Sequence, residues 1–149
     1  MVDDDNGRKS RILLITTVLC SYAGADTAGQ MHLEYAPNTY VIRTPAPVLF
    51  PVDFYMHCFE NGIDGIIIMS AGSDCPYEGA YQKLAARIPK VYGKMKEKGL
   101  NPKRLKLTAI CSVCTKPFLK EIQNMNQVLE ELGPVDMATG DQQKAAAPG

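Results

Sequence analysis

Two short, almost uninterrupted apolar runs constrain the fold of this chain more than any other feature. Residues 12–19 are interrupted only by Thr16 and Thr17, and residues 65–69 contain three consecutive isoleucines. Runs of this length, rich in β-branched residues and bounded by polar segments, are typical of strands covered on both faces. We therefore predict that both runs are strands buried inside a sheet.

Two further strands and several helices are predicted between and after these runs. The strand-like segments are 39–42 and 105–110, and apolar residues recur at helical spacing over 52–60, 78–98 and 117–132. Pro89 falls inside the second helix and is expected either to kink it or to split it in two. A short helix capped by Asp26 is expected between the first two strands.

Strand and helix alternate four times, which is typical of the α/β class. We predict a single flavodoxin-like or Rossmann-like domain with a four-stranded parallel sheet in the order 2-1-3-4, helices on both faces and right-handed crossovers. Sites in such sheets form at the carboxyl ends of the strands, beside the point where the strand order reverses. Candidate residues are judged by that rule.

Length and charge narrow the classes of partner. A chain of 149 residues is about one domain, and its 16 basic and 16 acidic residues give a formal net charge of zero. This balance removes the electrostatic attraction on which nucleic-acid and anionic-membrane binding normally depend, and no apolar stretch reaches the ~20 residues of a membrane span. A local basic stretch, which is either a solvated face or a surface for an acidic partner subunit, consists of Lys90, Lys94, Lys96, Lys98, Lys103, Arg104 and Lys106.

The chain has five cysteines, an odd number that does not suit a paired extracellular disulfide framework. The apolar run before Cys20 is similar to a lipoprotein signal. However, Leu19 is too large for the residue at the cleavage position, and three aspartates at 3–5 do not suit the positively charged region with which such a signal begins. We therefore expect a cytoplasmic protein whose cysteines serve metal binding, redox chemistry or core packing.

Four of the cysteines follow predicted strands. Cys20 comes after the first strand, Cys75 after the third, and Cys111 and Cys114 directly after the fourth. Because neighbouring strands lie only ~4.8 Å apart, the four thiols are expected to converge at one edge of the sheet. Cys58 instead lies within a predicted helix, where a small buried apolar side chain is the ordinary explanation.

The residues alone leave three interpretations of this set open. Thiolates are the usual ligands of iron–sulfur clusters and structural zinc, and the C-x-x-C spacing of Cys111 and Cys114 favours both. The same spacing suits a thiol–disulfide exchange pair, and cysteines after buried strands are often simply packed. His32 and His57 lack partners at metal-ligand spacing, and the sequence has neither G-x-G-x-x-G after a strand nor a P-loop.

Several segments together resemble the delta subunit family of methyl-viologen-reducing hydrogenases, also called the hydrogenase iron–sulfur subunit family. The similarity begins with Cys-Ser-Tyr-Ala-Gly-Ala-Asp-Thr-Ala-Gly at 20–29 and ends with Glu-Leu-Gly-Pro at 131–134. Between them lie matching segments at 35–38, 41–45, 59–65 and 74–81. We accordingly divide the chain into a flexible N-terminus at 1–10, a hydrogenase delta-subunit-like domain at 11–135 and a disordered tail at 136–149.

The resemblance implies an accessory subunit, not an enzyme on its own, that carries a [2Fe–2S] cluster. Such a protein relays electrons to or from a flavin-containing, heterodisulfide-reductase-A-like subunit. Its other partners are iron–sulfur, hydrogenase or dehydrogenase subunits of complexes that perform flavin-based electron bifurcation or confurcation. Similar modules occur in formate dehydrogenase, quinone-interacting oxidoreductase and class II benzoyl-CoA reductase complexes.

The chain also departs from the family pattern. Only Cys20 and Cys75 stand at family cysteine positions. The positions at which the family has further cysteines are occupied here by Thr17, Ala46, Ser70 and Val135. The chain keeps one family arginine as Arg43 and has Leu49 in place of another. A cluster of this kind takes four ligands. Either Cys111 and Cys114 complete a four-thiolate site with Cys20 and Cys75, or the chain is a cluster-free adaptor that docks the flavin subunit.

Overall fold

A computed structural model of the chain describes residues 9–18, 26, 29, 37–70, 77–110 and 115–136. The strands are β1 (Ile12–Thr17), β2 (Thr39–Thr44), β3 (Gly65–Ser70) and β4 (Leu105–Ala109). The helices are α2 (Val52–Glu60), α3 (Ala80–Glu97) and α4 (Thr115–Leu132), with short 3-10 helices η1 (Pro47–Leu49) and η3 (Pro102–Arg104). The short helix expected after Asp26, residues 1–8 and residues 137–149 lie outside the described residues.

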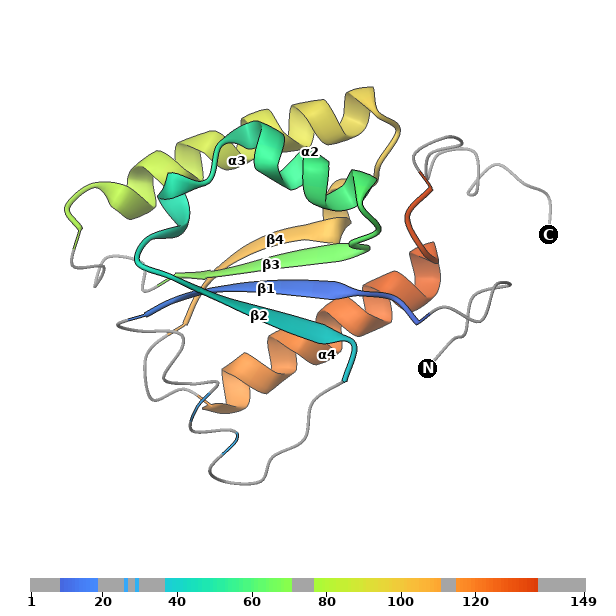
Figure 1. The fold of residues 1–149 in the computed structure, drawn as a ribbon, viewed down its shortest axis with the longest axis horizontal. Helices are drawn as coiled ribbons and strands as arrows, with labels where there is room; N and C mark the ends of the chain where they lie inside the picture. The colour runs from blue at the N-terminus through green and yellow to red at the C-terminus, as the bar shows by residue number, and fades with distance from the viewer. Residues whose placement is uncertain are drawn as a thin grey trace.

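The four strands form one parallel sheet in the order β2-β1-β3-β4 (Figure 1), which confirms the predicted order. Ile12 at the start of β1 lies opposite both Thr39 of β2 and Gly65 of β3. Ile66, the second residue of β3, lies opposite Leu105, the first residue of β4. All four strands therefore begin at one edge of the sheet and end at the other.

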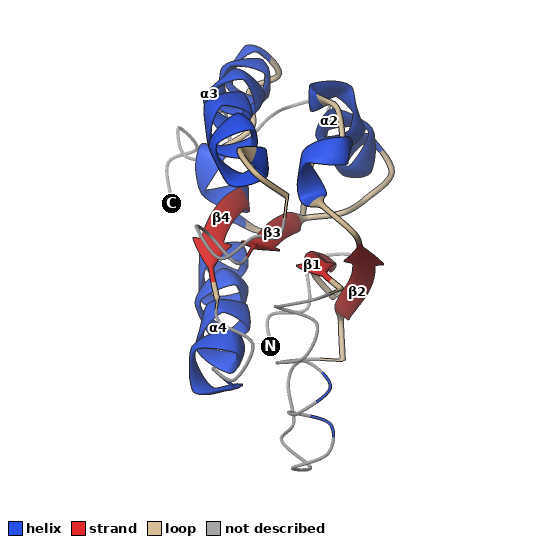
Figure 2. Ribbon diagram, turned by 90° about the vertical axis from the view of Figure 1, so that its left-hand side faces the viewer, coloured by secondary structure: helices blue, strands red, loops and turns tan. Residues whose placement is uncertain are grey.

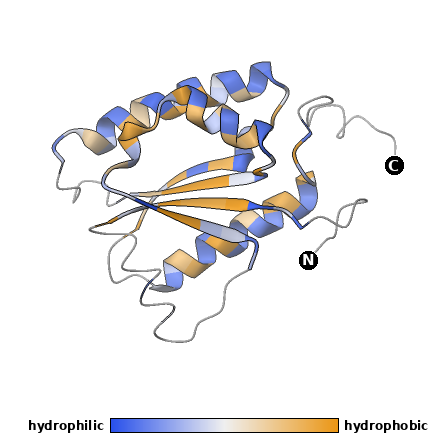
Figure 3. Ribbon diagram, in the orientation of Figure 1, coloured by the Kyte–Doolittle hydropathy of each residue, from blue (hydrophilic) through white to orange (hydrophobic). Residues whose placement is uncertain are grey.

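Helices cover both faces of the sheet, as predicted (Figures 1 and 2). Helices α2 and α3 lie side by side on one face and α4 lies on the other. Side chains along β1 alternate between the two: Leu13 and Ile15 pack beneath α2 and α3, whereas Ile12 and Leu14 pack against α4. Figure 3 shows the result as strongly hydrophobic central strands between amphipathic helices.

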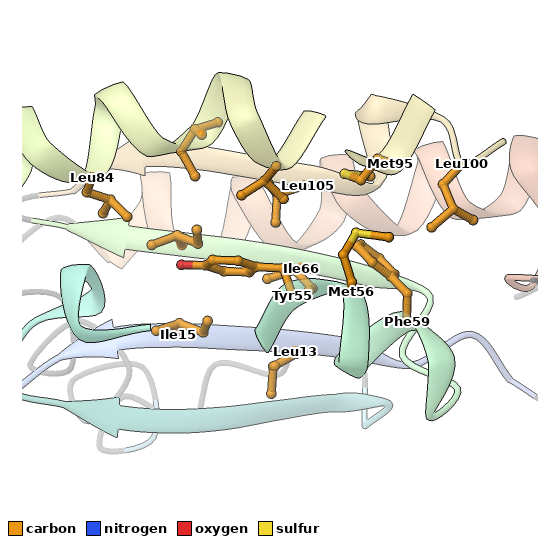
Figure 4. Packing of buried hydrophobic residues seen from close by; sticks show 13 residues of the cluster. Leu13, Ile15, Tyr55, Met56, Phe59, Ile66, Leu84, Met95, Leu100 and Leu105 are labelled. Atoms are coloured by element: carbon orange, nitrogen blue, oxygen red, sulfur yellow. The ribbon is translucent and has the colours of Figure 1, made fainter. Parts of the chain in front are cut away.

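The core beneath α2 and α3 is centred on large side chains of α2. Tyr55, Met56 and Phe59 are buried and pack against the sheet and against Leu84 and Met95 of α3 (Figure 4). On the opposite face, Phe118 and three further apolar residues of α4 occur at intervals of one helical turn: Ile122, Met125 and Leu129. Each strand that the sequence predicts to be covered on both faces is so covered.

Pro89 neither ends nor splits its helix, because α3 runs without interruption from Ala80 to Glu97. Proline removes one backbone hydrogen bond from a helix interior. Pro89 is exposed, so water can satisfy the backbone carbonyl that loses its donor. The buried side of α3, with Ile88 and Val91 on either side of the proline, continues unbroken.

Glycine follows α3 and α4, close to the ends of the helical ranges 78–98 and 117–132 that the sequence predicts. Gly99 has a φ of 75°, and Leu100 donates its N–H to the Met95 carbonyl at 2.8 Å. Gly133 has a φ of 70° and donates its N–H to the Leu129 carbonyl at 2.8 Å. Glycine adopts this left-handed conformation without steric cost, which lets the chain leave α3 and α4 abruptly.

Candidate functional site

The candidate site is the edge of the sheet at which the strands end. The pairing is maintained past the last strand residues, since Val18 donates its N–H to Thr44 O and Ile110 to Ser70 O, both at 2.9 Å. The strand order reverses between β1 and β3: the chain moves from β1 to β2 on one side and reaches β3 on the other. The segments after β1 and β3 therefore leave the sheet beside the position where α/β folds place their sites.

All four predicted ligands, Cys20, Cys75, Cys111 and Cys114, lie outside the described residues, so their convergence stays a prediction. The strand ends that precede them are described. Cys20 is three residues beyond Thr17, Cys75 is five beyond Ser70, and Cys111 directly follows Ile110. These segments follow the adjacent strands β1, β3 and β4. Strands β1 and β4 are separated by β3 and are therefore about 10 Å apart. An extended chain covers ~3.3 Å per residue, so the first two segments are long enough to reach across that span.

Three of the positions at which the resemblance implies cysteines lie together at this edge. Thr17 ends β1, Ser70 ends β3, and Ala46 follows β2; their exposed fractions are 2%, 2% and 5%. Thr17 and Ser70 are neighbours, one residue beyond the paired residues Thr16 and Met69. These three side chains supply two hydroxyls and a methyl group, which are not iron–sulfur ligands, so a cluster here depends on the cysteines of the adjoining segments.

The fourth such position, Val135, lies at the opposite edge of the sheet. Its backbone N–H donates to the carboxylate of Asp64 at 2.7 Å, and Asp64 immediately precedes β3. Val135 also packs against the core beneath α2 and α3. The absence of a thiol at Val135 therefore does not alter the carboxyl edge.

Cys58 carries a free thiol near the end of α2. Helix α2 begins near the carboxyl edge and runs back toward the start of β3 (Figure 1), and Cys58 is in its last turn, toward the edge at which the strands begin. The side chain is half-buried against the core beneath α2 and α3, and this burial raises the pKa of its thiol. A thiol that stays protonated is a poor ligand and nucleophile, in agreement with the predicted packing role.

The prediction that Arg104 belongs to an exposed basic stretch, which was based on the lysines around it in the sequence, is wrong. The structure buries Arg104 completely, and its guanidinium donates to Asp64 O at 3.1 Å and to Gly133 O at 2.9 Å. Binding the carbonyl of Gly133, just past α4, ties the end of that helix to the start of the sheet. The sequence signal for this network was weak, an acidic residue directly before β3 and a basic residue directly before β4, since both of these bonds are to backbone carbonyls.

A shallow groove of about 690 Å³ lies between α2 and α3 on the outer side of the molecule. It is lined by Phe54, Met56 and several charged residues, and it is bridged by an ion pair between Lys94 Nζ and Asp53 Oδ1 at 2.5 Å. His57 lies at this groove with Glu60 3.7 Å away. Within the described part of the chain, no three histidine, cysteine or acidic side chains gather as a metal site would require, and no helix is long and apolar enough to cross a membrane.

Comparisons with known proteins identify relatives over most of the chain. The family model for the delta subunit of methyl-viologen-reducing hydrogenase matches residues 12–133. The iron-sulfur D subunit of the F420-non-reducing hydrogenase of Archaeoglobus profundus is 27% identical over 124 residues, which are 83% of this chain and 90% of the relative.

Other relatives are much longer proteins. The A subunit of the ferredoxin/F420H2-dependent CoB-CoM heterodisulfide reductase of Methanosarcina acetivorans is 30% identical over 152 residues, covering 99% of this chain but 19% of that protein. The A subunit of the ferredoxin:CoB-CoM heterodisulfide reductase of Methanosarcina mazei is 32% identical over 117 residues, covering 78% of this chain and 15% of the relative. The chain thus spans less than a fifth of the length of these two reductase subunits.

Proposed function

The chain belongs to the methyl-viologen-reducing hydrogenase delta subunit family, and from that premise we propose that it is an electron-transfer accessory subunit of a multi-subunit oxidoreductase. Its relatives are named as subunits of hydrogenases and heterodisulfide reductases. The proposed role is therefore to pass electrons between larger partners.

The observation that carries this proposal is the common edge from which the cysteine-bearing segments leave the sheet. Strands β1, β3 and β4 are adjacent and in register, and Cys20, Cys75, Cys111 and Cys114 follow them within one to five residues of the last described position. Four thiolates are the usual ligand set of a [2Fe–2S] cluster, so the donor chemistry fits such a group. The bound cluster would supply one-electron transfer, and the protein would hold it at the carboxyl edge.

The proposed partner is a flavin-containing, heterodisulfide-reductase-A-like subunit. Relatives of this chain occur both as small separate subunits and as a minor part of the long heterodisulfide reductase A polypeptide. A separate chain that keeps the same fold would make by docking the contacts that the longer polypeptide makes internally. We propose a cytoplasmic complex of the bifurcating or confurcating type, with class II benzoyl-CoA reductase assemblies among the candidates.

Iron analysis of the complex purified without oxygen tests the cluster. We expect about two irons and two acid-labile sulfides per copy of this chain beyond those of its partners. Replacing Cys20 or Cys75 by serine should remove this iron, whereas Cys58→Ser is the matched control and should retain it. A complex whose iron content does not change in the Cys20 and Cys75 variants would contradict the cluster assignment.

One structural observation favours a second candidate, a cluster-free adaptor that docks the flavin subunit. The buried positions at the carboxyl edge supply no sulfur ligand, since they are occupied by Thr17, Ala46 and Ser70. The adaptor predicts that Cys111→Ser/Cys114→Ser leaves both assembly and electron transfer of the complex intact. The cluster proposal predicts that the same double variant assembles but transfers electrons much more slowly.

A further inference from the structure

Helix α3 is strongly basic, although the whole chain has no net charge. It carries five basic residues and one acidic residue, Glu97. Four of the basic residues recur at helical spacing and therefore share one side of the helix: Lys83, Arg87, Lys90 and Lys94. This side is turned toward η1 and α2, because Arg87 contacts η1 and Lys94 contacts α2.

The members of this row differ in what they bind. Lys94 is paired with Asp53, which raises the pKa of its ammonium group. The guanidinium of Arg87 donates to the carbonyls of Val48 and of Phe50, the latter at 2.7 Å. Lys83 and Lys90 are exposed, and neither has an acidic partner among the residues that the structure describes. Two cationic groups in the row thus have no acidic partner within the described structure.

Arg87 also fixes an exposed apolar side chain beside these cations. The two carbonyls that it binds flank Leu49 in η1, and Leu49 is 67% exposed, the most of any large hydrophobic residue described. The backbone of η1 is held further by Leu49 N–H donating to Ala46 O at 3.1 Å. A protruding leucine on a fixed backbone loses little conformational freedom on binding, which favours its use as a contact residue.

This Leu49 patch, formed by Leu49, Lys83, Arg87 and Lys90, lies next to the candidate site. Segment η1 follows the end of β2, and α3 begins after the end of β3 and runs back over the sheet, so η1 and the first turns of α3 lie at the carboxyl edge (Figure 1). Ala46, whose methyl group lies in the buried part of that edge, is only three residues before Leu49. A protein bound at the patch would therefore also be close to any group held at the edge.

We propose that the Leu49 patch is the docking surface for an acidic face of the partner subunit, which presents carboxylates to Lys83 and Lys90 around an apolar pocket for Leu49. An apolar centre with a charged rim is the usual anatomy of a protein–protein contact, and complementary charges orient the two surfaces. This inference rests on the proposed role as a subunit of a complex but not on the presence of a cluster.

Carbodiimide crosslinking of the natively purified complex tests the contact directly, because this reagent joins a lysine to a carboxylate only where the two touch. We expect crosslinks from Lys83 and Lys90 to aspartate or glutamate residues of one co-purifying chain. Crosslinks confined to other lysines of this chain, or linking two copies of it, would overturn the proposal while leaving the subunit role intact. If no other chain co-purifies, the subunit role and the docking surface both fail.

Charge-reversal variants test the same contact in a second experiment. We expect Lys83→Glu/Lys90→Glu, and separately Leu49→Asp, to reduce the amount of partner retained per tagged chain at low salt by at least about tenfold. The matched control is Lys116→Glu/Lys120→Glu, which reverses two exposed lysines of α4 on the other face of the sheet and should retain the partner fully. Circular dichroism of each isolated variant establishes that it is folded. Equal retention by the α3 and α4 variants would overturn the proposal, and the iron content of the same samples reports separately on the cluster.

Discussion

The carboxylate of Asp64 accepts the backbone N–H of Val135 at 2.7 Å, although 71 residues separate the two in the chain. Its other oxygen accepts the backbone N–H of Arg11, also at 2.7 Å. One fully buried side chain thus joins the residue before β1, the start of β3 and the segment after α4. This arrangement fixes the edge of the sheet opposite the candidate site.

Removal of this carboxylate should destabilise the whole domain. Asp64→Ala removes the carboxylate that accepts two part-buried N–H groups, and a hydrogen bond to a charged group contributes about 1.5–3 kcal/mol. We therefore expect the free energy of unfolding to fall by roughly 2–5 kcal/mol in urea denaturation. Asp53→Ala is the control: the Asp53 side chain is 81% exposed in its pair with Lys94, so its loss should cost less than about 1 kcal/mol. Similar losses in both variants would refute the role assigned to Asp64.

The buried hydroxyl of Tyr55 should lower the free energy of unfolding. Tyr55 is fully buried, and its Oη has no hydrogen-bond partner among the described residues. Tyr55→Phe removes an unsatisfied polar atom and keeps the ring in the core, so we expect a gain of about 1 kcal/mol in unfolding free energy. Tyr92→Phe should do the reverse, because Tyr92 Oη donates to Leu105 O at 3.0 Å. A loss of stability in Tyr55→Phe would reveal a partner for this hydroxyl in the rest of the chain.

The same tyrosine should make the protein sensitive to alkali. Burial raises the pKa of Tyr55 from 10.0 to about 12, and Cys58 adds to this while Arg87 opposes it. The folded state holds the Tyr55 proton more tightly than the unfolded state, so ionisation of Tyr55 favours unfolding. The free energy of unfolding is therefore unaffected by this group below pH 10 and falls as the pH rises to about 12. The difference corresponds to roughly 2–3 kcal/mol. Thermal melts from pH 9 to 12 should therefore fall less steeply for Tyr55→Phe than for the parent protein, and identical slopes would contradict the assignment.

The fold was predictable because its signals are local and mutually consistent. Continuous apolar runs marked β1 and β3, and alternation of strand with helix implied parallel pairing, so little freedom remained for the strand order. Pro89 was harder to interpret: its effect depends on whether the carbonyl it leaves free faces water, which is a tertiary property. Arg104 was misassigned for the same reason, since burial by α4 and by the segment after it is invisible in the neighbouring lysines.

The candidate site was predictable only in its location. Adjacent strand ends follow from topology, and the buried positions of Thr17 and Ser70 agree with a site beside the reversal of strand order. Whether four thiols meet there depends on segments without regular periodicity, for which sequence supplies composition but no geometry. The sequence indicated parts of the Leu49 patch separately, since Lys90 belongs to the basic stretch that could meet an acidic partner subunit and Leu49 stands in an apolar segment. Their combination was not predictable, because Arg87 and Leu49 lie in different elements.

Two glycines provide a test of the packing between β3 and α4. A Cβ built on Gly65 would lie 2.8 Å from Met125 Sδ and 3.0 Å from Leu129 Cδ1, whereas a Cβ on Gly93 would meet nothing within 4 Å. Gly65→Ala should therefore force the buried side chains of Met125 and Leu129 to shift and cost about 1–3 kcal/mol. Gly93 is an exposed position within α3, so Gly93→Ala should stabilise the protein by about 0.5–1 kcal/mol through helix propensity. Urea denaturation of both variants decides the matter, and a neutral Gly65→Ala would mean that α4 packs more loosely than described.

The buried hydroxyls at the ends of β1 and β3 permit a rescue experiment on the proposed cluster. Cys111→Ser/Cys114→Ser should lose its iron, because two thiols remain where four are needed. Adding Thr17→Cys and Ser70→Cys to that variant places new thiols on neighbouring strand ends, beside the segments that carry Cys20 and Cys75. We expect iron and the visible absorption of a [2Fe–2S] centre to return after anaerobic reconstitution, to at least about half of the parent level.

The control for that rescue places the new thiols elsewhere. Introducing cysteine at Gln127 and Glu131, two exposed positions in the last turns of α4, supplies the same number of thiols near the edge at which the strands begin and should restore no iron. Iron that persists in full in Cys111→Ser/Cys114→Ser before any rescue would show that these two residues are not ligands. Rescue by the α4 thiols as effective as rescue at β1 and β3 would show that the carboxyl edge has no special ability to hold a cluster, since thiol number alone would then determine the iron content.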